Sequence, residues 1–353
     1  MGRKIWLLVA LMLLLGALPV QAATLDVAGK SAVLMDVATG KVLYENNAHE
    51  ALPPASVTKV MTMLLIMEAI DSGKIGWEDM VKSIAVSSAN DCACAMAEHI
   101  AGSESAFVQM MNARARELGM NDTNFVNCTG LDDGEEAKDH KTSAYDIGIM
   151  SRQLLKYHPE IKKFTTIWMD TVRSGAFGLS NTNKLVRFYS GATGLKTGFT
   201  SGAGYCLSAS AQRDGMELVA VVMGCDTSAN RFAACKSMLD YGFANFALVS
   251  PQISGELEIP VKLGAEKSVT AVPGEDAQLL IDKSQRDMVT TDFSLEESVS
   301  APVSRGQRLG TMTVRAGEQI LMEIPLVAKT GVARLTWGDL FLRLLGNIAM
   351  AKQ

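Results

Sequence analysis

Two short apolar stretches near the start of the chain predict paired β-strands. Residues 31–36 and 41–45 form these stretches, and Ala38-Thr-Gly40 between them supplies a turn, so we expect a β-hairpin. Pro53-Pro54 then breaks the pattern. A long apolar run begins at Ser56 and continues to about Ile70, which predicts a helix.

Helical patterns dominate the middle of the chain. Residues 92–101 and 104–118 are rich in Ala, Met and Glu, and residues 142–164 also read as helix. Residues 121–141 between them are polar and strongly charged. Most of those charges indicate a solvated loop.

Strands return after this helical region. A strand is predicted from Lys196, and two apolar strands over 205–212 and 217–224 flank the turn Arg213-Asp-Gly215. A helix is predicted over 230–246. Strands at both ends with helices between them indicate the α+β class, with helices around a largely antiparallel sheet.

The pattern changes again near Ser250-Pro251. Residues 256–327 contain short alternating segments divided by Gly and Pro, which predicts an all-β module. Residues 335–350 then combine apolar positions at helical spacing with Asp339, Arg343 and Asn347 on another face. Those polar groups favour an amphipathic helix on a membrane surface over a spanning helix, and packing on its own domain is the alternative.

The N-terminus has the pattern of an export signal. Arg3 and Lys4 precede the apolar run 5–15, and Pro19 with small residues up to Ala22 resembles a cleavage site. An uncleaved anchor is the alternative, although the apolar run is short for a membrane span. We therefore expect a signal peptide over 1–22, domains over 23–249 and 250–332, and an anchoring helix over 333–353.

Composition agrees with a folded globular protein. The chain has 353 residues, of which 48% are hydrophobic and 20% charged, and its net charge is −5. No basic stripe is present, which argues against nucleic-acid binding. These values fit a chain long enough for two domains.

Six cysteines leave their chemistry open, because six thiols allow 15 pairings. Cys206 and Cys225 flank the predicted hairpin and are candidates to lie close across two strands. A structural zinc site is disfavoured because Cys92-Ala-Cys94 has unusual spacing and no His pair accompanies it. Disulfides in an oxidising compartment and buried free thiols both remain possible interpretations.

The first motif with chemistry is Ser56-Val-Thr-Lys59. Residues three apart share a helix face, so the amine of Lys59 can reach the hydroxyl of Ser56. A neutral lysine can then act as the base that activates a serine nucleophile. A helix cap followed by a surface lysine would produce the same four residues.

The second motif is Ser88-Ala-Asn90. Ser88 can pass a proton between amines and a leaving group, and Asn90 can hydrogen-bond a substrate amide. A turn before a helix is the structural alternative. Ser228-Ala-Asn230 repeats the triplet, which shows how weak it is alone.

The third motif is Lys196-Thr-Gly198. Lys196 adds positive charge where a carboxylate and a developing oxyanion would sit, and Thr197 can donate a hydrogen bond to that carboxylate. Gly198 allows close approach of a substrate backbone. Lys329-Thr-Gly331 repeats the triplet beyond the β-module and is interpreted as a strand end or linker.

With these motifs the chain resembles the low-molecular-mass penicillin-binding proteins, the serine-type D-alanyl-D-alanine carboxypeptidases. The resemblance runs from about Ala32 to Phe246 and continues more weakly to the C-terminus. The matching contexts are Pro54-Ala-Ser-Val-Thr-Lys59, Ser88-Ala-Asn-Asp91 with Ala97-Glu-His-Ile-Ala-Gly102, Phe107-Val-Gln-Met-Met-Asn112 with Leu118-Gly-Met, Thr129-Gly-Leu-Asp132, Asn181-Thr-Asn183, and Gly194-Leu-Lys-Thr-Gly-Phe-Thr200 with Ala203-Gly-Tyr205.

The resemblance implies a penicillin-binding-protein or serine β-lactamase-like domain, a small β-domain and a terminal amphipathic helix. It also implies a peptidoglycan stem peptide ending in D-Ala-D-Ala as substrate, β-lactams as inhibitors, no metal or cofactor, and a place at the outer face of the cytoplasmic membrane. Residue by residue, it gives Ser56 as nucleophile, Lys59 as general base, Ser88 and Lys196 as proton relay, Asn90 as a substrate contact, the N–H groups of Ser56 and Phe199 as oxyanion hole, and Thr197, Gly198 and Arg231 at the substrate carboxylate.

One segment departs from the pattern. Cys128 and Thr129 precede Gly130-Leu131, where relatives often carry other residues, so substrate preference and deacylation are open. The alternatives are an endopeptidase that cuts D-amino-acid crosslinks, a β-lactamase using Glu135 or Glu136, and an inactive membrane-attached scaffold. For Arg231, a surface salt bridge is the structural alternative.

Overall fold

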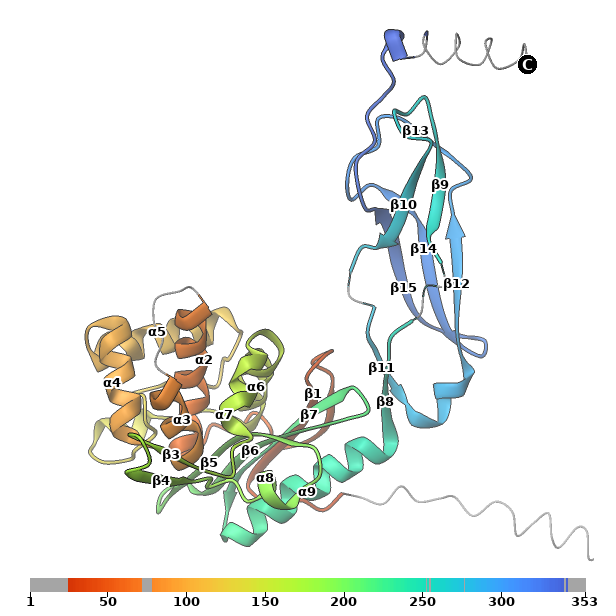
Figure 1. Cartoon of the computed structure of the whole chain (residues 1–353). Coiled ribbons are helices and arrows are strands. Elements are labelled where there is room, and N and C mark those ends of the chain that lie inside the picture. Colours follow the sequence, from red (N-terminus) through yellow and green to blue (C-terminus); the bar gives the residue numbers. More distant parts are fainter. Residues whose placement is uncertain are drawn as a thin grey trace, which may run out of the picture.

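The computed structural model describes residues 25–71, 78–251, 253, 255–275, 277–339 and 341. Its main sheet has five antiparallel strands, and both predicted hairpins are confirmed. The turn between the strands Gly204–Arg213 and Met216–Cys225 has positive φ at Asp214 and Gly215, as a two-residue hairpin turn requires. The strands run in the order β2 (Val42–Asn46), β1 (Ser31–Asp36), β7 (Met216–Cys225), β6 (Gly204–Arg213) and β5 (Ala192–Thr200) (Figure 1).

Helices cover both faces of this sheet, and the period of two along each strand explains how. Val33 and Val221 belong to the core beneath α2 (Lys59–Asp71) and α6 (Ala144–Tyr157). Leu34 and Ala220, one residue along, belong to the opposite core beneath α9 (Ser228–Asn245). Successive side chains point to opposite faces, so β1 and β7 are apolar almost throughout.

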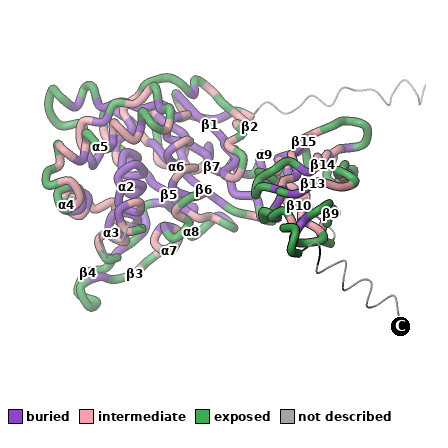
Figure 2. The backbone as a smooth tube through the Cα atoms, turned by 90° about the horizontal axis from the view of Figure 1, so that it is seen from above, coloured by how far each residue is buried: buried purple, intermediate pink, exposed green. Residues whose placement is uncertain are grey.

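Helix α2 is buried along most of its length, as the purple tube in Figure 2 shows. A helix surrounded by protein needs apolar residues on all sides, which explains its continuous run of Val, Met, Leu and Ile. Three further helices surround it: α3 (Glu78–Ser87), α4 (Asn90–Ala101) and α5 (Glu104–Glu117). The expected helices at 92–101 and 104–118 are thus confirmed, whereas α3 was not predicted.

Three local predictions were wrong. Ser56 does not begin the long helix but lies in a 3₁₀ turn, η1 (Ala55–Thr58), and α2 starts at Lys59. The helix expected over 142–164 ends at Tyr157, and η3 (Pro159–Ile161) and α7 (Lys162–Thr165) follow because Pro159 cannot continue the first helix. Strand β5, which was expected to begin at Lys196, begins at Ala192.

Some elements were not predicted. They are the hairpin β3 (Met169–Val172) and β4 (Phe177–Ser180) and the turn helices η2 (Glu136–Asp139) and α8 (Leu185–Phe188).

The C-terminal part is all-β, as expected, and stands beyond the helical body (Figure 1). A short ribbon leads to it, in which β8 (Phe246–Val249) pairs with β11 (Leu279–Asp282). A 3₁₀ helix, η4 (Lys283–Met288), follows β11. The six-stranded sheet has the order β12 (Val289–Leu295), β14 (Arg308–Ala316), β15 (Gln319–Ala328), β10 (Ser268–Pro273), β9 (Leu257–Lys262) and β13 (Val299–Ser300).

Both expected terminal segments fall largely outside the described residues. This holds for the signal segment 1–22 and for most of the helix expected over 333–353. Within the residues that are described, no helix combines the length and apolarity needed to cross a membrane.

Candidate active site

The turn that carries Ser56 is held by two glycines from other parts of the chain. Ala55 adopts a left-handed φ of 49°. A Cβ added to Gly130 would lie 1.8 Å from the Ala55 carbonyl oxygen, and one added to Gly198 would lie 2.7 Å from that of Pro54. No side chain fits at such distances, so the backbones at Gly130 and Gly198 enclose the serine turn.

Lys59 lies directly beneath this serine. Its Nζ donates to Ser56 Oγ at 3.1 Å and to the Thr129 carbonyl at 2.7 Å, and the side chain is fully buried. Burial lowers the pKa of Lys59 to about 8, against a smaller opposing effect of the Cys128 and Cys94 thiols. With such a pKa, roughly a tenth of the amine is neutral at about pH 7, so Lys59 can accept the serine proton.

Ser88 and Asn90 come from the turn between α3 and α4. Ser88 is half-buried with φ 64°, a left-handed conformation that a non-glycine residue adopts at some energetic cost. Asn90 begins α4, and its Oδ1 is buried without a hydrogen-bond partner among the described residues. Neither side chain hydrogen-bonds directly to Ser56 or Lys59 in the described structure.

Lys196 and Thr197 lie on β5, the edge strand of the main sheet. Lys196 Nζ donates to the Thr197 carbonyl at 2.8 Å, and the side chain is buried. Burial lowers the pKa of Lys196 well below its ordinary value, and the charges of Lys59 and Arg231 add to this effect. Thr197 Oγ1 donates to Thr182 Oγ1 at 2.7 Å.

The Asn181-Thr-Asn183 segment connects β5 to the end of α3. Asn183 Nδ2 donates to the Gly194 carbonyl at 2.9 Å, and the Thr182 N–H donates to the Val86 carbonyl at 3.1 Å. Asn181 Oδ1 accepts from the Asn183 N–H at 2.9 Å. This segment fixes the strand bearing Lys196 relative to the turn bearing Ser88.

Arg231 contacts the sheet rather than the surface. Its Nη1 donates to the carbonyls of Gly198 at 2.9 Å and Cys206 at 3.3 Å, and the residue is buried. The guanidinium also lies over the rings of Tyr205 and Phe232. The surface salt bridge considered from sequence is wrong, because none of the described ion pairs includes this buried side chain.

Phe199 follows Gly198 and points to solvent. It is exposed and stacks on Tyr205 at a centroid distance of 4.2 Å. Phe199 also borders a surface hollow whose lining includes Tyr205 and Asp226.

A separate cavity of about 620 Å³ lies beside the turn that carries Ser88, and its lining includes Ser87 and Ala89.

His140 is a site residue that the sequence did not reveal. It lies in the charged stretch that was expected to be a solvated loop, yet it is buried. Its Nδ1 accepts from the Val126 N–H at 3.1 Å, so Nε2 carries the proton and donates to Thr58 Oγ1 at 2.8 Å. Burial lowers the pKa of His140 to about 4. The neutral imidazole thereby connects the serine turn to the segment before Gly130.

The six thiols are unpaired. The hairpin partners Cys206 and Cys225 do not bond to each other; Cys225 Sγ donates to the Ala28 carbonyl at 2.9 Å, and Cys206 Sγ lies 3.8 Å from that of Ala203. Cys94 and Cys128, in contrast, are in direct contact.

Comparison with known proteins identifies the family. The D-alanyl-D-alanine carboxypeptidase family model matches residues 18–83 and 74–227, and the model of the penicillin-binding protein 5 C-terminal domain matches 252–334. The D-alanyl-D-alanine carboxypeptidase DacF of Bacillus subtilis (strain 168) is 39% identical over 353 residues, which cover 90% of this chain and 89% of that protein.

Solved structures show the same relationship. Penicillin-binding protein 5 from Haemophilus influenzae has a TM-score of 0.74 at 28% identity, covering 89% of this chain and 100% of its own. The ampicillin-bound form of penicillin-binding protein D2 from Listeria monocytogenes has a TM-score of 0.59 at 31% identity, covering 62% of this chain and 99% of its own. By its match to the family model and its identity to these relatives, the chain belongs to the D-alanyl-D-alanine carboxypeptidase family of low-molecular-mass penicillin-binding proteins.

Proposed function

We propose that this chain is a serine-type D-alanyl-D-alanine carboxypeptidase, which removes the terminal D-Ala from peptidoglycan stem peptides and is acylated by β-lactams. The observation that carries the proposal is the contact between buried Lys59 Nζ and Ser56 Oγ at 3.1 Å. A serine hydroxyl that contacts a buried amine of lowered pKa is a nucleophile with its base already in place.

Acylation begins when neutral Lys59 accepts the Ser56 proton and Ser56 Oγ attacks the carbonyl of the penultimate D-Ala. The oxyanion is stabilised by the backbone N–H groups of Ser56 and Phe199. This assignment is supported by the packing of the serine turn on β5, because a Cβ on Gly198 would lie 3.1 Å from the Ser56 nitrogen. Ser88 and Lys196 pass a proton to the leaving D-Ala amine, and water then releases the acyl group.

The substrate carboxylate is recognised at β5. Thr197 Oγ1 donates to it once its proton turns away from Thr182 Oγ1, and the positive potential of Lys196 and Arg231 adds long-range attraction. Arg231 acts chiefly by holding the strand, since it donates to the Gly198 carbonyl. The side-chain amide of Asn90, whose buried Oδ1 has no partner among the described residues, hydrogen-bonds a substrate amide.

A carboxypeptidase fits better than a β-lactamase. Fast hydrolysis of a penicilloyl enzyme needs a carboxylate poised to activate water. Glu135 and Glu136 are both exposed, and Glu135 pairs with Lys138. Neither carboxylate is held at Ser56, so we expect a long-lived penicilloyl enzyme.

The enzyme acts outside the cytoplasm, because peptidoglycan stem peptides are located there. We propose export through residues 1–22 and attachment to the membrane surface through the amphipathic segment 333–353, with the β-rich part between the anchor and the catalytic part. If deletion of 333–353 leaves the exported protein as firmly membrane-bound as before, the attachment proposal is wrong.

The deciding experiment measures products from two substrates. Purified enzyme is given a D-Ala-D-Ala-ended stem pentapeptide and, separately, a crosslinked dimer of stem peptides. Free D-Ala from the pentapeptide with an intact dimer supports the carboxypeptidase, whereas preferential cleavage of the dimer identifies an endopeptidase. Penicillin labelling without release of either product would favour the third alternative, an inactive membrane-attached scaffold.

A further inference from the structure

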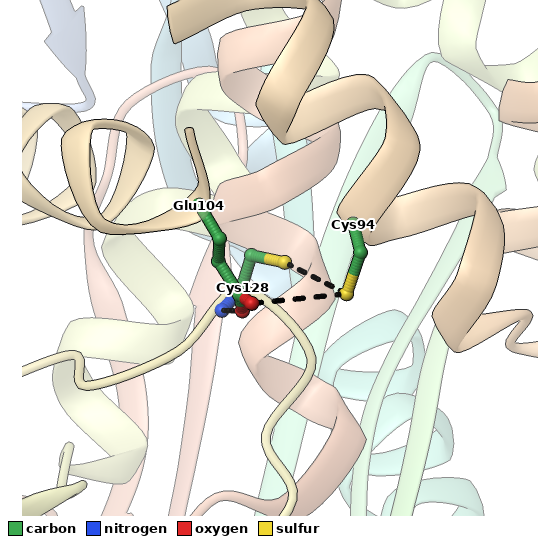
Figure 3. Close-up of side chains that lie close together, drawn as sticks. All are labelled: Cys94, Glu104 and Cys128. Carbon is green, nitrogen blue, oxygen red and sulfur yellow. Dashed lines mark hydrogen bonds between the residues drawn. The ribbon is translucent and has the colours of Figure 1, made fainter. Parts of the chain in front are cut away.

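Two cysteines from distant parts of the chain meet behind the candidate base. Cys94 lies on α4 and Cys128 in the segment after α5, and their sulfur atoms are 3.8 Å apart although the residues are separated by 34 positions (Figure 3). Glu104, at the start of α5, points its carboxylate toward the same place, with Oε2 at 4.0 Å from Cys94 Sγ.

The backbone of Cys128 is held firmly on two sides. Its N–H donates to Glu104 Oε1 at 3.1 Å, and its carbonyl accepts from Thr62 Oγ1 at 2.7 Å. The next carbonyl along the chain, that of Thr129, is the one that accepts from Lys59 Nζ at 2.7 Å. The thiol pair is therefore one residue away from the group that orients the candidate base.

We propose that Cys94 and Cys128 form a disulfide that joins α4 to the segment carrying Thr129 when the protein meets a low-molecular-mass disulfide as oxidant. The inference rests on the proposed function only in that an exported chain encounters such oxidants. A disulfide requires the sulfur atoms to approach to about 2.05 Å, and here they start from a contact of 3.8 Å.

The surroundings assign the order of the two steps. Cys128 is fully buried, whereas Cys94 is partly exposed. The Cys128 S–H donates to Cys94 Sγ, and the Cys94 S–H is directed at Glu104. Cys94 is thus the thiol that a dissolved oxidant can reach, so Cys94 reacts first.

The chemistry balances as thiol–disulfide exchange. Cys94 loses its proton and attacks one sulfur of the oxidant, which releases one small thiol and leaves a mixed disulfide on Cys94. Cys128 then loses its proton and attacks Cys94 Sγ, which releases the second small thiol. Two protein thiols are oxidised, and one external disulfide is reduced to two thiols.

A bound metal is the competing interpretation of the same three groups, whose ligand atoms all lie within 4.8 Å of one another. Burial and the nearby Glu104 raise the pKa values of both thiols, which opposes metal binding and disulfide exchange alike, because both need thiolates. One oxygen of Glu104 is already engaged by the Cys128 N–H. This engagement of a would-be metal ligand favours the cross-link.

The experiment compares reduced and oxidised forms of the purified protein. After treatment with oxidised glutathione, thiols are alkylated, and a non-reducing peptide map identifies any bridge. We expect a bridge between Cys94 and Cys128, with the thermal unfolding midpoint raised by about 5–15 °C, since a cross-link over such a loop restricts the unfolded chain. Cys94→Ala and Cys128→Ala should show neither effect.

Cys92→Ala is the matched control, because Cys92 lies two residues from Cys94 on the same helix and lines the cavity by the Ser88 turn instead. It should oxidise as the wild type does. Free, alkylatable Cys94 and Cys128 after treatment, or a bridge between other cysteines, overturns the proposal. Stoichiometric zinc retained by wild type and lost in both variants, with the thiols unoxidised, overturns it in favour of a metal site.

The proposed enzymatic function can fail separately. Penicillin acylation is followed in both redox forms, and the oxidised form should keep it at temperatures where the reduced form has lost it. Absence of acylation in both forms would refute the proposed function, while the peptide map and the unfolding midpoint would still decide on the disulfide.

Discussion

Gly130 offers a sharp test of how the serine turn is built. Its φ is 82°, and a Cβ added there would lie 1.8 Å from the Ala55 carbonyl oxygen and 2.4 Å from the Ala55 carbonyl carbon. Both atoms are backbone, so no side-chain rotation relieves the clash. In Gly130→Ala, either the serine turn or the segment at Gly130 must move.

The structure gives the size of that movement. Real Cβ contacts essentially never fall below 3.0 Å, so a separation of 1.8 Å must grow by at least 1.2 Å. Thr129, next to Gly130, supplies the carbonyl that holds Lys59 Nζ. Misplacement of catalytic groups by about 1 Å lowers rates by roughly 100-fold, and we expect a loss of that order in acylation.

Gly134→Ala is the matched control. Gly134 has a similarly left-handed φ of 90° in the same segment, yet no atom lies within 4 Å of an added Cβ. Each substitution costs about 1 kcal/mol of backbone strain, but only Gly130→Ala should disturb the site. The assay is the second-order rate of acylation by a fluorescent penicillin, with folding checked by urea unfolding. If the folded Gly130→Ala protein acylates within threefold of Gly134→Ala, the reasoning is wrong.

Three further predictions follow from the buried cations and the buried imidazole. Because Lys59 must be neutral to accept a proton and its pKa is about 8, acylation should rise with pH through a midpoint near that value; a rate that is flat between about pH 6 and pH 9 contradicts this role. The pKa of His140 is about 4 in the folded protein against an ordinary 6.5. Its contribution to the free energy of unfolding is therefore fully present above pH 6.5 and is lost, by about 3 kcal/mol, as the pH drops through 4. Urea unfolding should show this pH dependence in wild type and less of it in His140→Gln. Arg231→Met removes the guanidinium that donates to the carbonyls of Gly198 and Cys206, so it should lower the free energy of unfolding by about 2 kcal/mol and also slow acylation. Arg231→Lys should retain more of both. Equal values for the two variants would argue against a role of Arg231 in holding β5.

The sequence predicted the site well where local patterns decide the structure. The hairpin turns at Ala38-Thr-Gly40 and Asp214-Gly215 follow from local rules, and β5, which carries the third motif, pairs with β6 in the main sheet. The spacing of Ser56 and Lys59 correctly predicted their contact, even though the serine lies in a 3₁₀ turn rather than a helix.

The remaining features depend on contacts between distant segments. The left-handed Ala55 is set by the close approach of Gly130 and Gly198, which no local pattern reveals. His140 is surrounded in sequence by charged residues, so its burial could not be inferred from composition. Arg231 looks like any helix-surface arginine until its place beneath β5 is known.

The central claim is that Ser56, activated by Lys59, is the residue that becomes acylated. The most direct measurement is mass spectrometry of peptides from the penicillin-treated protein, in wild type and in Ser56→Ala, with release of D-Ala from a D-Ala-D-Ala-ended peptide measured on the same samples. We expect the adduct on Ser56 and its loss together with D-Ala release in the variant. An adduct on another residue, or undiminished D-Ala release by folded Ser56→Ala, would contradict the account.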